Sequence, residues 1–121
     1  MDIDIRKHSQ VHVVKCRGAF RLGQAVDEFR SLMDGILREP APQIVVNLSE
    51  VNSLDSSGIG ALVRTQTAAK QHGGAVKLVN PTKFVLQTLK LVGLLNVFEL
   101  HQEEAEAVKS FESGFQVASS S

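Results

Sequence analysis

The amino-acid sequence predicts an α/β domain with a mostly parallel central sheet, an antiparallel edge strand at the N-terminus and about four helices. Short apolar runs alternate with segments of helical spacing along the 121 residues. Strands that alternate with helices favour parallel pairing through right-handed crossovers. Hydrophobic residues make up 43% of the chain, enough for one core and too many for a disordered protein. We therefore expect one domain over residues 1–116 and a disordered tail at 117–121.

The chain begins with a predicted β-hairpin followed by a helix. Val11–Arg17 has the composition of a strand, and Ile3–Lys7 is a weaker strand before it. Residues 8–10 would join them as an antiparallel pair at the edge of the sheet. Apolar side chains then recur at helical spacing over residues 24–38. Pro40 ends this helix, because proline cannot donate a backbone hydrogen bond.

The middle of the chain predicts a buried strand, a polar loop, a helix and another strand. Residues 43–48 form a near-continuous apolar run, typical of a strand covered on both faces. A short polar loop leads to a helix over about Ser57–His72, which Gly73 and the glycine after it would stop. Ala75–Val79 is the next strand.

The last third predicts a helix, a strand and a final helix. Asn80 is a plausible helix cap, with Pro81 at the first helical position. The apolar stripe of this helix would be buried and consists of Val85, Leu86, Leu89 and Val92. Asn96–Leu100 is predicted as the last strand and Glu103–Phe115 as an amphipathic helix with acidic residues in its first turn.

Composition excludes several classes of partner. Thirteen basic residues balance thirteen acidic ones, and the six phenylalanines are the only aromatic side chains. This argues against a nucleic-acid partner and against an anionic membrane surface. The single cysteine, Cys16, allows no internal disulfide. The N-terminus lacks a signal-peptide pattern, and no apolar run reaches the ~20 residues that span a bilayer. We expect a cytoplasmic protein without membrane insertion.

The most informative segment joins the apolar run at 44–48 to the following helix. Asp55, Ser56 and Ser57 lie at the predicted mouth of that helix, where backbone N–H groups lack partners and the helix dipole is positive. A hydroxyl at such a place can cap the helix or accept a phosphate, and the residues alone leave both readings open. Asp55 and Ser56 are the candidate caps.

Glycines flank Ile59 in the first turn of this helix. Gly58 and Gly60 would leave Ser57 unshielded on its exposed side, while Ile59 anchors the turn in the core. On a helix that starts near Ser57, further residues follow on the same side at intervals of helical spacing, and these are our candidate partner contacts: Ala61, Arg64 and Ala68.

No motif indicates catalysis or a metal site. The pair Gly58 and Gly60 lacks the third glycine of a dinucleotide-binding loop, because residue 63 is valine. Neither serine lies in a Gly-x-Ser-x-Gly elbow. The four histidines are scattered without metal-ligand spacing. We expect no catalytic residue, no metal and no cofactor.

In this strand–loop–helix context the chain resembles the STAS domain, the family of sulfate-transporter and anti-sigma factor antagonist domains. The resemblance rests on Asp55–Gly60 after Val45–Leu48, Gly73–Gly74, Asn80–Pro81 and Leu91–Leu94. It covers roughly Val11–Phe111 and is strongest toward the small freestanding bacterial anti-sigma factor antagonists. It implies the STAS fold.

The resemblance also implies a partner-switching mechanism. A STAS antagonist binds an anti-sigma factor, which is also a serine kinase of the histidine-kinase-like ATPase type, and a sigma factor is freed. The kinase phosphorylates a serine of the motif, the antagonist lets go, and a serine phosphatase resets it. By position in the motif, the acceptor here is Ser57. Such a chain is a regulator and not an enzyme.

Two other functions stay open. Many antagonists have a Leu-Asp pair near the start of the first helix, with its acidic group close to the acceptor serine, whereas Arg21 or Gly23 stands in that stretch here. This departure keeps open a non-phosphorylated scaffold subunit of a membrane transporter's ATPase complex. The remaining hypothesis is a small-molecule enzyme on a flavodoxin-like sheet, although fold alone indicates no chemistry.

Overall fold

The computed structural model describes the backbone of residues 1–120 and the side chains of residues 1–112. Its five-stranded sheet has the order β1-β2-β3-β4-β5, with β1 antiparallel to β2 and all other neighbours parallel. The strands are β1 (Asp2–His8), β2 (Val11–Phe20), β3 (Gln43–Leu54), β4 (Ala75–Val79) and β5 (Glu99–His101). The predicted α/β class, with its antiparallel edge strand, is confirmed.

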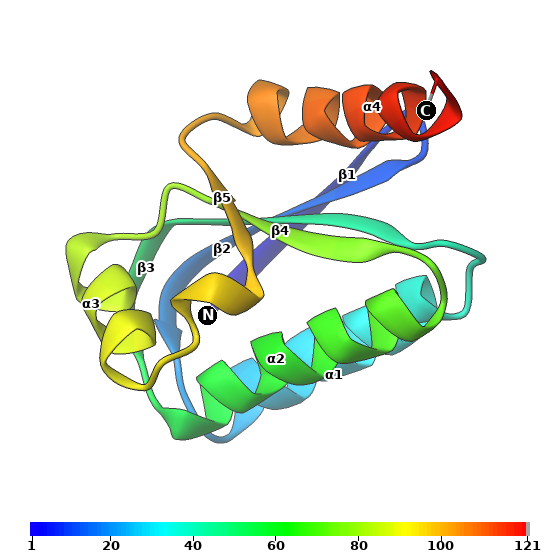
Figure 1. The fold of residues 1–121 in the computed structure, drawn as a ribbon. Helices are drawn as coiled ribbons and strands as arrows, with labels where there is room; N and C mark the ends of the chain where they lie inside the picture. The colour runs from blue at the N-terminus through cyan, green and yellow to red at the C-terminus, as the bar shows by residue number, and fades with distance from the viewer. Residues whose placement is uncertain (121) are drawn as a thin grey trace.

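Helices cover both faces of this sheet (Figure 1). The helical segments are α1 (Gln24–Leu37), α2 (Ser56–Gln71), α3 (Lys83–Leu91), the short 3₁₀ helix η1 (Leu95–Val97) and α4 (Glu104–Ser120). In Figure 1, α1 and α2 lie side by side below the sheet, α4 lies above it, and α3 stands at one end. The four predicted α-helices are therefore present.

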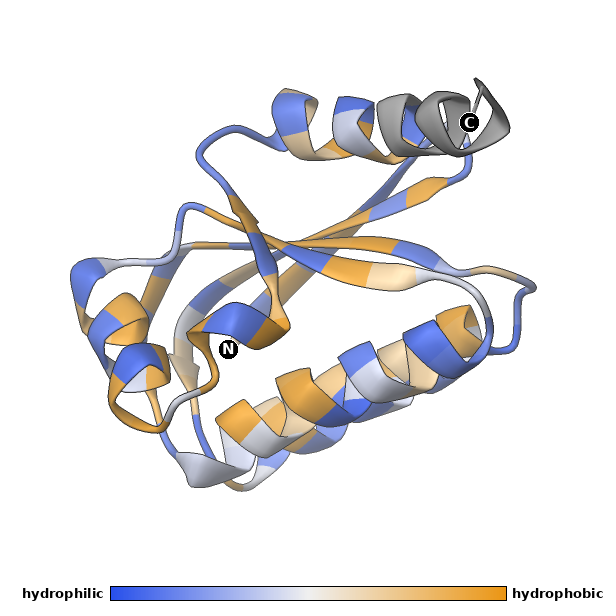
Figure 2. Ribbon diagram, viewed as in Figure 1, coloured by the Kyte–Doolittle hydropathy of each residue, from blue (hydrophilic) through white to orange (hydrophobic). Residues whose placement is uncertain are grey.

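The sheet separates two cores. The larger core fills the space between the sheet and α1, α2 and α3, and its most buried large side chains include Phe20, Phe29, Met33, Leu62 and Leu89. The smaller core lies under α4 and consists of Val11, Val13, Val45, Val79, Ala107 and Phe111. Figure 2 shows apolar residues along the strands and on the side of α4 that faces them. A sheet buried on both faces explains the continuous apolar runs of its central strands.

The N-terminal hairpin forms as predicted. His8 pairs with Val11, so Ser9 and Gln10 make a two-residue turn. Ser9 has φ 57°, the left-handed conformation that tight hairpin turns require.

The predicted polar loop after residue 48 is wrong. β3 continues to Leu54, because β2 also continues to Phe20 and the two strands stay paired to their ends. Irregular register near Gly18, whose φ is 106°, lets the pairing continue past a bulge. Val51 and Leu54 are buried on this extension, while Asn52 between them is exposed and Ser53 is partly buried. The polar residues of this segment therefore belong to a strand whose burial is irregular, and they do not form a loop.

The predicted start of α3 is also wrong. Thr82 is the N-cap, with its Oγ1 accepting a hydrogen bond from the Val85 backbone N–H. Asn80 has φ 46° and its backbone N–H donates to the His101 carbonyl at 2.7 Å, so it belongs to the turn after β4. Pro81 therefore precedes the cap and is not the first helical residue.

The apolar stripe of α3 is only partly as predicted. Val85 and Leu89 are fully buried and Leu86 is half-buried. Val92 is 52% exposed, because the helix ends at Leu91 and the chain turns away at Gly93, whose φ is 73°.

The two C-terminal elements, β5 and α4, have bounds that differ from the predicted ones. The last strand was predicted at 96–100 but is Glu99–His101. It starts later because residues 95–97 form η1. The predicted helix at 103–115 begins one residue later and reaches Ser120, so residues 117–120 lie within α4. Ser121 lies outside the described residues, and the domain boundary at 116 stays a prediction.

Candidate functional site

Asp55 organises the turn between β3 and α2. One carboxylate oxygen, Oδ1, accepts a hydrogen bond from the Gly58 backbone N–H at 2.9 Å and caps the helix. The other, Oδ2, accepts from the Leu22 backbone N–H at 2.9 Å. The Asp55 backbone N–H donates to the Phe20 carbonyl at 3.3 Å. Asp55 therefore ties the loop between β2 and α1 to the start of α2.

These donors stabilise the ionised form of the Asp55 side chain. Hydrogen bonds from the backbone N–H groups of Leu22 and then Gly58 hold the pKa of this carboxyl below its usual range, and Arg21 contributes by its positive charge. The turn therefore carries a fixed negative charge at neutral pH, with a guanidinium close enough to act on it.

The two serines of the motif occupy the first turn of α2. Ser56 is exposed and is the first helical residue, while Ser57 is partly exposed. The prediction of Ser56 as a cap is wrong, because the preceding carboxylate has taken that position. Both side chains lie at the positive end of the helix dipole, where a negatively charged group is favoured.

Gly58 and Gly60 lie in different surroundings, so each position has a different reason for being glycine. A Cβ on Gly58 would lie 2.4 Å from the Phe20 carbonyl oxygen, so this buried glycine lets α2 approach the end of β2. Our expectation that Gly58 leaves the acceptor serine unshielded is therefore wrong. Gly60 fits that expectation, because no atom lies within 4 Å of the place where its Cβ would be. Ile59 is buried in the larger core, as predicted.

The expected partner surface on α2 needs one correction. Arg64 is exposed and Ala68 is half-buried, so both can meet a partner. Ala61 is only 3% exposed and belongs to the larger core. The reason is that α2 packs against both the sheet and α1, so it buries a wider arc than a helix with one covered face.

Leu22 is a surface residue of this site that sequence reasoning missed. Its side chain is 77% exposed although its backbone N–H is bound to Asp55. A large apolar side chain held in the open beside the motif is suited to a protein contact. The sequence signal that could have indicated this residue is a single leucine in the turn between Gly18 and Gly23.

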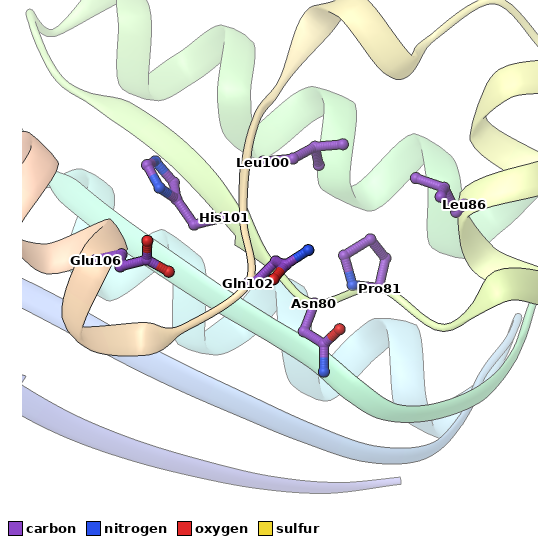
Figure 3. A pocket seen from close by; sticks show the side chains of 7 residues that line it. All are labelled: Asn80, Pro81, Leu86, Leu100, His101, Gln102 and Glu106. Carbon is purple, nitrogen blue, oxygen red and sulfur yellow. The ribbon is translucent and has the colours of Figure 1, made fainter.

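A shallow pocket lies elsewhere, at the carboxyl ends of β4 and β5. It is lined by Asn80, Pro81, Leu86, Leu100, His101, Gln102 and Glu106. Figure 3 shows His101 and Glu106 at one end of it and Leu86 at the other. The lining contains no hydroxyl, thiol or amine nucleophile, and His101 Nε2 is already 2.6 Å from Glu99 Oε2. The pocket therefore lacks a nucleophile–base pair.

The described residues also bear on metal sites and membrane segments. They contain no group of three or more His, Cys, Asp or Glu side chains that could hold a metal ion. In the same part of the chain, no helix combines the length and hydrophobicity that a membrane crossing needs. Cys16 is buried, and this burial raises its thiol pKa to about 12, as suits a core position.

The fold and the Asp55–Ser57 turn define a STAS domain. The model of the STAS domain family matches residues 2–107, and the chain belongs to this family. Among its curated relatives is the anti-sigma F factor antagonist of Paenibacillus polymyxa. The two sequences are 26% identical over 113 residues, which cover 93% of this chain and 96% of the relative.

Solved structures share the fold. The unphosphorylated form of the anti-sigma factor antagonist SpoIIAA superimposes with a TM-score of 0.81 at 20% identity, covering 93% of this chain and 97% of that one. The phosphorylated form of the Bacillus cell fate determinant SpoIIAA gives a TM-score of 0.74 at 18% identity, covering 91% and 99%. The predicted family and fold are confirmed.

Proposed function

We propose that this chain is an anti-sigma factor antagonist whose partner binding is switched off by phosphorylation of Ser57. The observation that carries the proposal is the position of Ser57, partly exposed in the first turn of α2 directly after the Asp55 cap. The names of its relatives support the antagonist role, and the phosphorylated SpoIIAA structure gives a precedent for the modification on this fold.

The local structure can accept a phosphate. Phosphorylation adds about −1.5 to −2 charges, which the positive end of α2 favours. The Arg21 side chain, whose charge already acts on Asp55, is a nearby counter-charge. We therefore expect the fold to survive the modification.

The partner interface would not accept the same charge. A dianion enclosed in a desolvated contact without a partner costs several kcal/mol, and about 1.4 kcal/mol corresponds to tenfold in affinity. The contact would involve Leu22, Arg64 and Ala68, which surround or follow the motif and are at least partly exposed. Phosphorylation can thus release the partner by local repulsion and desolvation, without a change of fold.

The proposed partner is an anti-sigma factor that is also a serine kinase of the histidine-kinase-like ATPase type. The antagonist frees a sigma factor by binding it, and a serine phosphatase removes the phosphate. In this cycle the chemistry belongs to the kinase and the phosphatase, so the chain itself is a non-enzymatic regulator in the cytoplasm.

The proposal is tested with kinase, ATP and fragmentation mass spectrometry that distinguishes adjacent serines. We expect phosphate on Ser57 in the wild type and in Ser56→Ala, and none in Ser57→Ala. Ser57→Asp should keep the unfolding midpoint of the wild type and bind the anti-sigma factor at least tenfold more weakly. A Ser57→Asp variant that binds the anti-sigma factor as tightly as the wild type does would refute the electrostatic switch.

One observation favours a second function. The stretch between β2 and α1 has Arg21 or Gly23 where many STAS antagonists have an acidic group, so this surface could serve a scaffold that is never phosphorylated. A transporter ATPase complex is then the expected partner. Affinity purification separates the two functions: recovery of a serine kinase supports the switch, and recovery of a permease with its ATPase supports the scaffold.

A further inference from the structure

The strand β1 is an open edge of the sheet. It pairs with β2 on one side, and no other strand of the described chain pairs with it. It has seven residues, whereas the opposite edge strand β5 has three. Five of the seven side chains carry a charge or can gain one, and only Ile3 is partly buried. A long exposed edge strand is a template for another strand unless its side chains prevent pairing.

The side chains of β1 are divided between the two faces of the sheet. Arg6 and His8 lie opposite Val13 and Val11, which belong to the smaller core under α4. By strand alternation, all even-numbered side chains of β1 lie on this α4 face, namely Asp2, Asp4, Arg6 and His8. Ile3, Ile5 and Lys7 lie on the opposite face.

The charges on the α4 face follow an order that is complementary to itself. The acids Asp2 and Asp4 come first along the strand, and the basic side chains of Arg6 and His8 come last. When such a strand pairs antiparallel with a copy of itself, the acidic half of each strand meets the basic half of the other. Opposite charges across a strand pair stabilise it, and like charges directly opposite destabilise it.

The charges also select one register. Side chains that face each other across an antiparallel pair lie on the same face, so a symmetric pair must be centred on a residue. A pair centred on Asp4 or on Arg6 places like charges opposite each other at its centre. A pair centred on Ile5 places Asp4 opposite Arg6 of the second copy and Asp2 opposite its His8. Of these three registers, only the one centred on Ile5 opposes no like charges on the α4 face.

The centre of this register is apolar. Ile5 is 37% exposed, and in the Ile5-centred pair it would pack against Ile5 of the second copy. Arg6 already donates to Glu104 and lies 3.9 Å from Asp4 of its own strand. A guanidinium has five N–H donors, so it can keep the contact with Glu104 and still meet an acid across the new pair.

We propose that two copies of this chain form a symmetric dimer by antiparallel pairing of their β1 strands, centred on Ile5, which joins the two sheets into one. This interface lies on a different element from Ser57, so it goes beyond the proposed switch. The contact is short, and we expect a weak dimer with a dissociation constant in the micromolar range or above.

Sedimentation equilibrium over a wide concentration range tests the dimer. The wild type should shift from the monomer mass toward twice that mass. Asp4→Lys places lysine opposite Arg6, and Arg6→Glu places glutamate opposite Asp4, and each change occurs twice in a symmetric dimer. We expect each single variant to raise the dissociation constant at least about tenfold. Asp34→Lys, an equal charge change at an exposed site on α1, should dimerise as the wild type does.

Mixing the two single variants gives the decisive result. In the mixed dimer, the new lysine faces the new glutamate while the remaining Asp4 faces the remaining Arg6, so dimerisation should return. Circular dichroism checks that each variant is folded. A wild type that stays monomeric overturns the proposal, as does an Asp4→Lys variant that dimerises normally or a mixture that does not recover.

Discussion

At the scale of single residues, Asp55 joins two parts of the chain that are far apart in sequence. Its two carboxylate oxygens hold the first turn of α2 and the backbone of Leu22 at the same time. The phosphate that we propose on Ser57 would lie beside this carboxylate, in a turn that already balances one anion against backbone donors. Asp55, which caps α2, therefore also holds the exposed Leu22 in place.

The close approach of Gly58 to β2 yields a prediction for a matched pair of variants. In Gly58→Ala the new methyl group would meet the Phe20 carbonyl oxygen at 2.4 Å, so we expect the free energy of unfolding to fall by about 1–3 kcal/mol. In Gly60→Ala the methyl group enters open space within a helix, and we expect a gain of about 0.5–1 kcal/mol. Urea unfolding measures both. Equal effects of the two changes would contradict this reading of Gly58.

At the scale of elements, the start of α3 depends on a threonine that has two hydrogen bonds. Thr82 Oγ1 accepts from the Val85 backbone N–H at 3.3 Å and donates to the Val51 carbonyl at 3.1 Å. The same side chain therefore caps α3 and attaches it to the C-terminal half of β3, the half that the sequence pattern did not indicate.

We expect Thr82→Ala to lower the free energy of unfolding by about 1 kcal/mol, because it removes the cap and the bond to β3 together. Asn80→Gly is the control: glycine accepts the left-handed backbone of this position, and the backbone hydrogen bond to His101 is kept. Chemical denaturation followed by circular dichroism compares the two. A larger loss in Asn80→Gly would mean that Asn80 is the important residue after all.

At the scale of the whole molecule, a charged cluster attaches α4 to the sheet. Glu99 Oε2 lies 2.9 Å from Lys77 Nζ and 2.6 Å from His101 Nε2. Lys77 also donates to Ser110 Oγ at 2.7 Å and lies over the Phe111 ring. The cluster joins β4, β5 and α4, so the smaller core is closed by polar contacts as well as by apolar packing.

This cluster predicts acid sensitivity. Hydrogen bonds from Lys77 and then His101 lower the pKa of Glu99 to about 2. Its stabilising effect is therefore complete above the pKa of the unfolded chain, about 4.3, and is lost as the pH falls through about 2. Because the side chain is half exposed, solvent screening reduces the effect. We expect Glu99→Gln to lower the thermal midpoint at neutral pH, with the difference from wild type disappearing near pH 2. A constant difference would exclude this origin.

Much of the fold could be predicted because its signals are local. The extents of α1 and β4 were predicted to within one residue, since proline, glycine and the spacing of apolar residues mark them directly. The place of Ser57 at the start of a helix was predicted for the same reason. The errors occurred where a distant neighbour decides. Residues 49–54 are a strand because β2 pairs with them, and Ala61 is buried because α2 packs against both the sheet and α1.

The sequence by itself determined the order of strands and helices and the motif at the mouth of α2, because hydrophobic period and turn residues act over a few positions. The family came from the resemblance of the chain's motifs to those of the STAS domain. Only the tertiary structure decided that Asp55 holds Leu22 and that Gly58 is required by β2. Each of these depends on which segments meet in space, and the pairing of strands and the packing of helices are decided by the whole chain at once.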